Sequence, residues 1–145
     1  MLLVINMRSI QKLDMRIMGY ITMFEKLTKT ESLDFLENKG QLVFFVKENS
    51  AKKAAGKQGS NIKRLSHLLK KKVKIIELNE DPKKFVQSLI FPLEPSSIEL
   101  KEGKLVLSFK TSEERARIIG RNGSNLEFLN KLLENHHKLS LKVVS

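Results

Sequence analysis

One short pattern occurs twice in the chain, 64 residues apart, and it limits the folds that the chain can adopt. The first copy is Gly56-Lys57-Gln58-Gly59-Ser60-Asn61-Ile62, and the second is Gly120-Arg121-Asn122-Gly123-Ser124-Asn125-Leu126. Each copy reads glycine, basic residue, amide, glycine, serine, asparagine and aliphatic residue. A repeat in matching surroundings predicts two copies of one structural unit.

The chemistry of the pattern suits a phosphate backbone. Two glycines three positions apart allow positive φ and let another backbone come close. A helix that starts after such a turn directs its N–H groups and the positive end of its dipole at the same space. The alternative is a plain helix–helix corner capped by glycine. That alternative explains neither the basic residue nor the repeat.

The composition favours a polyanionic partner. Lys and Arg total 27 against 16 Asp and Glu, which gives a net charge of +11. An anionic membrane surface is the competing interpretation, but the basic residues cluster around turns rather than along one amphipathic helix. The absence of cysteine excludes disulfides and thiolate chemistry. Without a long apolar run or a signal-peptide core, the chain is expected to be cytoplasmic, with no membrane partner.

Hydrophobic periodicity predicts the elements of the first half. A helix is expected from Met15 to about Leu27, with Asp14 as its N-cap and residues 1–13 as an extension. Its apolar stripe, widened by Met18 and Met23, is interpreted as core. The next predicted elements are a strand over 33–37, a hairpin turn at 38–40 and a central strand over 41–47. A helix over 51–55, capped by Asn49 or Ser50, leads into the first turn. A helix then runs from Ser60 to about Lys71, with Ile62, Leu65, Leu68 and Leu69 on its apolar face, and a strand follows over 73–78.

The second half predicts the same order. Asp81 is expected to cap a helix with Pro82 at its first position. Next come a strand over 98–100, a hairpin turn at 101–103, a strand over 105–109, a helix over 112–119, the second turn, a helix with Leu126, Leu129, Leu132 and Leu133, and a strand over 139–144. The predicted domains are therefore 14–79 and 80–145.

The order helix, strand, strand, helix, Gly-x-x-Gly, helix, strand resembles the K-homology (KH) domain of the second topological type. That resemblance covers residues 14–144 and implies an α+β fold, with a three-stranded sheet packed on three helices in each domain. A tandem at this spacing is similar to the archaeal NusA-like transcription factors, most closely at 24–28 and 56–65. It implies single-stranded RNA binding in transcription elongation, termination or antitermination, and it leaves no room for the polymerase-binding and S1 domains of the bacterial protein.

KH modules clamp about four nucleotides by their backbone, and this assigns roles to residues of both turns. The glycines admit the phosphates, the basic residue supplies charge and the amide is a neutral donor. The candidate RNA-binding residues are Gly56, Lys57, Gln58 and Gly59, flanked by Lys52, Lys53, Lys63 and Arg64, and then Gly120, Arg121, Asn122 and Gly123, with Arg117 beside them. Ile62 and Leu65 are either groove floor or core, and Arg115 either contacts RNA or pairs with a nearby acid.

The two halves differ in charge. Residues 41–76 hold ten Lys and Arg against one acid, whereas residues 104–145 hold eight against four. The second long helix has Glu127 and Phe128 where the first has Lys63 and Arg64. The first half is therefore expected to contribute more of the phosphate affinity. Phe128 either packs between the units or stacks on a base.

Other function classes have weaker support. No acid or hydroxyl residue is spaced suitably from His67, His136 or His137 for a triad or metal site, and 56–60 lacks the P-loop pattern, so neither catalysis, a cofactor nor a metal is expected. The alternative function is docking on RNA polymerase or a ribosomal particle, with RNA binding secondary. Nascent transcript or ribosomal RNA, RNA polymerase and single-stranded DNA remain open as partners. We expect a monomer.

Overall fold

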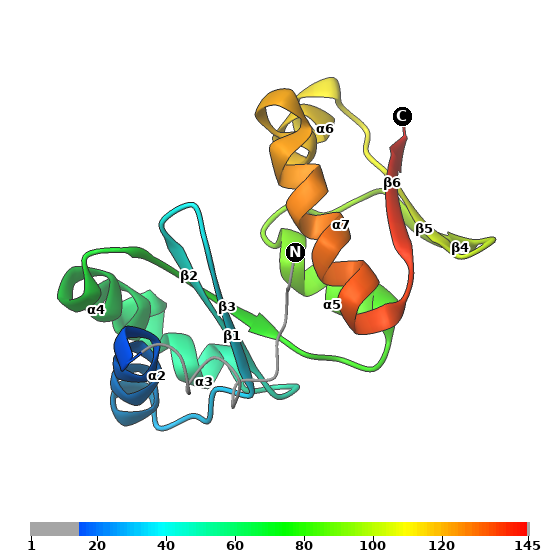
Figure 1. Cartoon of the computed structure of the whole chain (residues 1–145). Helices are drawn as coiled ribbons and strands as arrows, with labels where there is room; N and C mark the ends of the chain where they lie inside the picture. Colours follow the sequence, from blue (N-terminus) through cyan, green and yellow to red (C-terminus); the bar gives the residue numbers. More distant parts are fainter. Residues whose placement is uncertain (1–14, 145) are drawn as a thin grey trace. The chain divides into compact units, whose positions relative to one another are not determined.

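A computed structural model describes residues 15–144, and Figure 1 traces them along the sequence. The chain divides into two compact units between Asn79 and Glu80. The predicted N-cap Asp14 and the extension over 1–13 lie outside the described residues. None of the helices in the described range has the length and apolar character needed to cross a membrane.

The first unit is built around a central strand. Its described elements are α2 (Met15–Thr28), β1 (Asp34–Asn38), β2 (Gln41–Val46), α3 (Ala51–Ala55), the 3-10 turn η1 (Lys57–Gly59), α4 (Ser60–Leu69) and β3 (Lys72–Glu77). β2 pairs antiparallel with β1 on one side and parallel with β3 on the other. Phe44 is thereby opposite both Phe35 and Ile75. The prediction that residues 41–47 form the central strand is confirmed.

The second unit repeats this arrangement. Its described elements are α5 (Pro82–Ile90), β4 (Ser97–Lys101), β5 (Lys104–Ser108), α6 (Ser112–Ile119), η2 (Arg121–Gly123), α7 (Ser124–His137) and β6 (Ser140–Val144). β5 is central, antiparallel to β4 and parallel to β6. The chain is therefore α+β, with one mixed three-stranded sheet in each unit.

Both hairpins use the same two-residue turn. Lys39 and Gly40 have φ values of 49° and 80°, and Glu102 and Gly103 have values of 48° and 77°. Positive φ at both central residues is the type I′ geometry, whose twist matches that of paired strands. The turns predicted at 38–40 and 101–103 are confirmed, and they fix the register of each hairpin.

Aromatic packing holds α2 on the first sheet. The ring of Phe24 stacks on that of Phe44 with centroids 4.2 Å apart, and both side chains are fully buried. Met18 and Met23 are 38% and 36% exposed, so their assignment to the core is wrong. At 3.6 residues per turn, Met18 lies about 100° around the helix from Ile17, beside the stripe that faces the sheet.

The helix termini correct the sequence predictions in part. The Asp81 carboxylate accepts the Lys83 N–H at 2.9 Å, so the predicted cap of α5 is confirmed. Ser50 precedes α3, but its side chain makes no capping bond; the Glu77 carboxylate accepts the Ala51 N–H at 3.0 Å instead. α4 ends at Leu69 because Lys70 is left-handed, with φ of 56°, two residues before the predicted end. Leu68 is 46% exposed and does not belong to the apolar face of α4.

Replacing Asp34 by asparagine should stabilise the protein more at pH 8 than at pH 5. Burial raises the pKa of this carboxyl to about 7, against the hydrogen bond from the Phe35 N–H, which lowers it. The folded state keeps this proton up to about pH 7, whereas the unfolded state loses it near pH 4. The unfolding free energy of the wild type therefore falls as pH rises from about 4 to 7. A rise of two pH units within that window lowers the unfolding free energy by about 3 kcal/mol. Urea unfolding at both pH values measures the difference, and an equal effect at both would contradict the burial argument.

Candidate nucleic-acid interface

The two Gly-x-x-Gly turns have the same backbone conformation. Gly56 has φ 81° and ψ 170°, and Gly120 has φ 75° and ψ 173°. The amide residues are both left-handed, with φ of 55° at Gln58 and at Asn122. In each turn the N–H of the second glycine donates to the carbonyl of the first, at 3.0 and 3.1 Å. The repeat in the sequence is therefore a repeat in three dimensions.

The first glycine of each turn lies against the helix that follows. A Cβ at Gly56 would be 2.8 Å from the Ser60 hydroxyl oxygen and 2.9 Å from the Asn61 side chain. A Cβ at Gly120 would be 2.7 Å from that of Asn125. The second glycines have open space around them and need glycine for positive φ alone. The first position of each turn thus requires glycine for both space and backbone conformation, whereas the second requires it for backbone conformation alone.

An asparagine side chain fixes each pair of flanking helices. The Asn61 amide donates to the Ala54 carbonyl at 3.1 Å, and the Asn125 amide donates to the Ile118 carbonyl at 2.8 Å. Each bond joins the start of the second helix to the last turn of the first, across the Gly-x-x-Gly turn. The sequence pattern contained this asparagine in both copies, but its role was not predicted. Its recurrence at the same position was the available signal.

The helices after the turns begin without a side-chain cap. Gly59 and Gly123 occupy the N-cap positions of α4 and α7, and neither helix has a side-chain capping bond. The N–H groups of Ser60 and Ser124 donate to the carbonyls of Lys57 and Arg121. The other N–H groups of a first helical turn have no partner within the helix, so they are available, with the helix dipole, to an anion at the turn.

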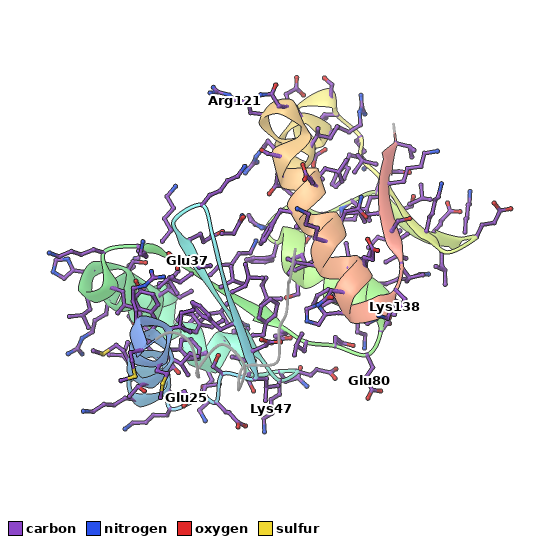
Figure 2. The ribbon with its side chains drawn as sticks, in the orientation of Figure 1. Glu25, Glu37, Lys47, Glu80, Arg121 and Lys138 are labelled. Atoms are coloured by element: carbon purple, nitrogen blue, oxygen red, sulfur yellow. The ribbon has the colours of Figure 1, made fainter. Side chains whose placement is uncertain are left out.

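Nine predicted contact side chains of the two turns and their flanks are exposed. They are Lys52, Lys53, Lys57, Gln58, Lys63, Arg64, Arg117, Arg121 and Asn122. None of the seven cationic ones pairs with a carboxylate among residues 15–144. Figure 2 shows Arg121, in the second turn, directed outward. Unpaired, solvated cations beside both turns are available for phosphates.

Packing resolves one open assignment, that of Leu65. Leu65 is fully buried in the first core and Ile62 is partly buried against that core, so Leu65 is not a groove floor. Arg115 donates to the Phe109 carbonyl at 3.4 Å and pairs with no acid among residues 15–144, so the expected local ion pair is not formed. The sequence could not show this contact, because it joins α6 to the residue after β5.

No protein-family model matches the chain. The probable transcription termination protein NusA of Methanocaldococcus jannaschii is 34% identical over 128 residues, which cover 86% of this chain and 70% of that relative. The chain belongs to the archaeal NusA family. A NusA of the same description from Methanococcus vannielii is 33% identical over 110 residues, covering 74% of this chain and 64% of the relative.

The fold has a counterpart among solved structures. The crystal structure of APE1850 superposes with a TM-score of 0.67, covering 88% of this chain and 96% of the other. Its identity is 22%, so the likeness concerns the fold alone. Three of the residues 24–28, which carried part of the NusA resemblance, have structural contacts, and Thr28 is buried. Phe24 lies in the core, and the Glu25 carboxylate accepts the Ser32 N–H at 2.8 Å.

The two turns of this NusA-family chain have different surroundings. Lys63 and Arg64 are exposed near the start of α4. At the corresponding place on α7, Glu127 pairs with Lys131 at 3.4 Å and Phe128 is half-buried. The second turn therefore has fewer available cations on its long helix.

Both histidines at the end of α7 pack against Phe85 of α5. The ring centroids of His136 and His137 each lie 5.0 Å from that of Phe85, and His136 Nδ1 is 2.9 Å from the Leu132 carbonyl oxygen. Burial, with a smaller contribution from His137, lowers the pKa of His136 despite that hydrogen bond. Within residues 15–144, no group of three or more His, Asp or Glu residues could hold a metal ion.

Proposed function

We propose that the chain binds single-stranded RNA through both Gly-x-x-Gly turns, and that each unit is a KH domain of the second type. The observation that carries the proposal is the turn built twice with one geometry, next to unpaired cations and an uncapped helix start. The parallel pairs β2–β3 and β5–β6, each joined through two helices and the turn, support the type II assignment.

Each part of a turn would have a distinct role in holding RNA. Gly59 and Gly123, where an added Cβ would face open space, admit a phosphate to the backbone, and N–H groups at the starts of α4 and α7 donate to it. Lys57 and Arg121 add charge, whereas Gln58 and Asn122 add neutral donors. Such contacts position the strand without reading its sequence. Lys52, Lys63, Arg64 and Arg117 extend the electrostatic track on either side.

Membership of the family supports a role in transcription. The relatives carry the description of probable transcription termination proteins. We propose that this chain acts on the nascent transcript during elongation, termination or antitermination, with RNA polymerase as a further partner. A protein-docking role in which RNA is secondary predicts the opposite binding pattern. In that case a polymerase or ribosome pull-down would survive nuclease treatment while isolated RNA would not bind.

Fluorescence anisotropy with a short single-stranded RNA pool should give a strongly salt-dependent affinity. If four to six phosphates are neutralised, log K falls against log salt with a slope of about −3 to −4. The measurement is a titration at several salt concentrations, with a neutral-backbone oligonucleotide as the control. A slope near zero, or no binding at low salt, would overturn the proposed function.

A further inference from the structure

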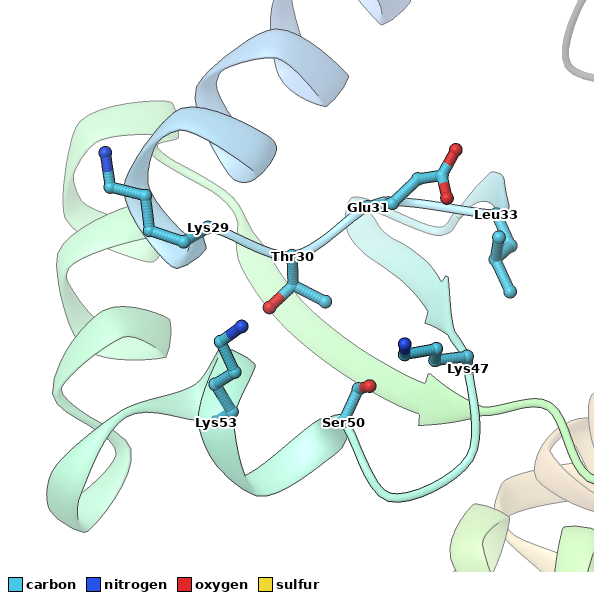
Figure 3. Close-up of a pocket in the computed structure, with 7 residues that line it drawn as sticks. All are labelled: Lys29, Thr30, Glu31, Leu33, Lys47, Ser50 and Lys53. Atoms are coloured by element: carbon cyan, nitrogen blue, oxygen red, sulfur yellow. The ribbon is translucent and has the colours of Figure 1, made fainter.

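A second candidate site lies in the first unit, on the side of α3 away from its Gly-x-x-Gly turn. It is a cavity of about 160 Å³ between the loop after α2, the end of β2 and the start of α3. Figure 3 shows the side chains around it. The residues that line it are Lys29, Thr30, Glu31, Leu33, Lys47, Ser50 and Lys53.

The loop after α2 is held in place by hydrogen bonds. The Thr28 hydroxyl donates to the Phe24 carbonyl at 2.7 Å and accepts the Thr30 N–H at 3.2 Å. The Glu25 carboxylate accepts the Ser32 N–H at 2.8 Å. These bonds anchor the loop to the last turns of α2. One wall of the cavity is therefore already formed without a ligand.

The opposite wall contains a hydroxyl that opens to the cavity and has no hydrogen-bond partner among residues 15–144. Ser50 is only 6% exposed, and its side chain points into the cavity in Figure 3. It forms no side-chain hydrogen bond with any residue in the range 15–144. The capping role that would explain a serine here belongs to Glu77, which accepts the Ala51 N–H. The Ser50 hydroxyl oxygen keeps contact with the cavity and is therefore available to a ligand there.

The cavity also concentrates positive charge. Lys47 and Lys53 extend their amines toward the space between Thr30 and Ser50, whereas Lys29 lies at the rim with its amine directed away (Figure 3). No ion pair joins any of these lysines to a carboxylate in the described part of the chain, although Glu31 lines the same cavity. Neighbouring amines without a counter-ion repel one another, and a multivalent anion removes that repulsion.

We infer that this cavity binds a phosphate group, with Lys47 and Lys53 supplying charge and Ser50 a hydroxyl donor. Its volume suits a phosphate with several waters, since a water occupies about 30 Å³ in the liquid. It is below the roughly 300 Å³ typical of pockets for larger ligands, so the site takes the phosphate group and not a whole nucleotide. The phosphate belongs either to the RNA strand, a source that rests on the proposed function, or to a small phosphorylated molecule.

The second unit does not reproduce these side chains. The 64-residue offset places Glu114 at the position of Ser50 and Arg117 at that of Lys53. The Glu114 carboxylate accepts the Thr111 hydroxyl at 3.1 Å. A carboxylate in place of the serine opposes anion binding. The site therefore belongs to the first unit alone, the unit with the greater excess of basic residues.

Titration of the ¹⁵N-labelled full chain with inorganic phosphate tests the site directly. The amide signals of Ser50 and Ala51 should shift, with a dissociation constant on the order of millimolar. Lys47→Gln, Lys53→Gln and Ser50→Ala should each weaken binding at least about fivefold, a loss expected for a charged or hydroxyl donor. The matched control is Lys26→Gln, an exposed lysine on α2 outside the cavity, which should bind as wild type does. Absence of shifts at these amides, or equal binding by all four variants, would overturn the inference.

RNA titrations with the same variants identify the source of the phosphate. If the RNA strand supplies it, Lys47→Gln and Ser50→Ala weaken RNA binding several-fold and RNA shifts the Ser50 amide. If a small molecule supplies it, RNA affinity is unchanged in Ser50→Ala while phosphate binding is lost. The titration with inorganic phosphate does not depend on RNA binding. Failure of the proposed function and failure of the cavity site are therefore separate results.

Discussion

Gly120→Ala should destabilise the second unit by about 3 kcal/mol, whereas Gly123→Ala in the same turn should cost only about 1 kcal/mol. Gly120 combines φ 75° and ψ 173° with a Cβ position 2.7 Å from Asn125. That backbone region is essentially restricted to glycine and costs about 1–3 kcal/mol for other residues, before the steric overlap is added. Gly123 is left-handed but has open space around it.

The same comparison applies to the first turn. Gly56→Ala should be more destabilising than Gly59→Ala, because only at Gly56 would an added Cβ have neighbours closer than 4 Å. A small domain has only about 3–10 kcal/mol of stability, so 3 kcal/mol is a large share. Urea unfolding followed by circular dichroism measures all four variants. Equal losses at the first and second glycines would contradict the close packing described for the turns.

Lys57→Asp combined with Gln58→Asp should lower RNA affinity by at least about 30-fold, equal to about 2 kcal/mol. The pair changes the charge of the turn by three units and places two carboxylates where phosphates are proposed to lie. Arg121→Asp with Asn122→Asp makes the same change in the second turn. Its effect should be smaller, about 3- to 10-fold, because α7 has an acid and a half-buried aromatic residue where α4 has two exposed cations.

Anisotropy titrations at one salt concentration compare these variants. The matched control is Lys39→Asp with Gln87→Asp, which changes net charge equally at exposed positions outside the two turns and their flanking helices. Its affinity should fall less than about threefold, through long-range charge alone. If the control loses as much affinity as the turn variants, net charge and not the turns accounts for binding. A larger loss in the second turn would reverse the predicted ranking of the units.

The sequence predicts the order of the elements well because local signals agree in both halves. The Asp81-Pro82 start of α5 and the two glycine-containing hairpin turns are each specified by a few neighbouring residues. The structure contains all three at the predicted positions. Periodicity is less reliable at the edge of an apolar stripe. Met18, Met23 and Leu68 are hydrophobic and near the stripe, yet they are exposed because the sheet covers only the centre of it.

Contacts between distant segments could not be read from the sequence. Glu77 caps α3 from the end of β3, which leaves Ser50 facing the cavity. That cavity joins three separate segments, and Lys53 lines it although the pattern assigned it to the RNA track. Asn61 and Asn125 were visible in the repeat, but the carbonyls that they bind became evident only from the paired helices.

The most direct test of RNA binding through both turns is a ¹⁵N NMR titration of the full chain with a single-stranded RNA of about ten nucleotides, enough for two KH modules. Seven glycine amides report on it: Gly56, Gly59, Gly120 and Gly123 lie in the turns, and Gly19, Gly40 and Gly103 lie on α2 and the two hairpins. We expect large shifts for the four turn glycines and small shifts for the other three. Saturable binding that leaves the turn glycines unmoved would contradict the proposed interface.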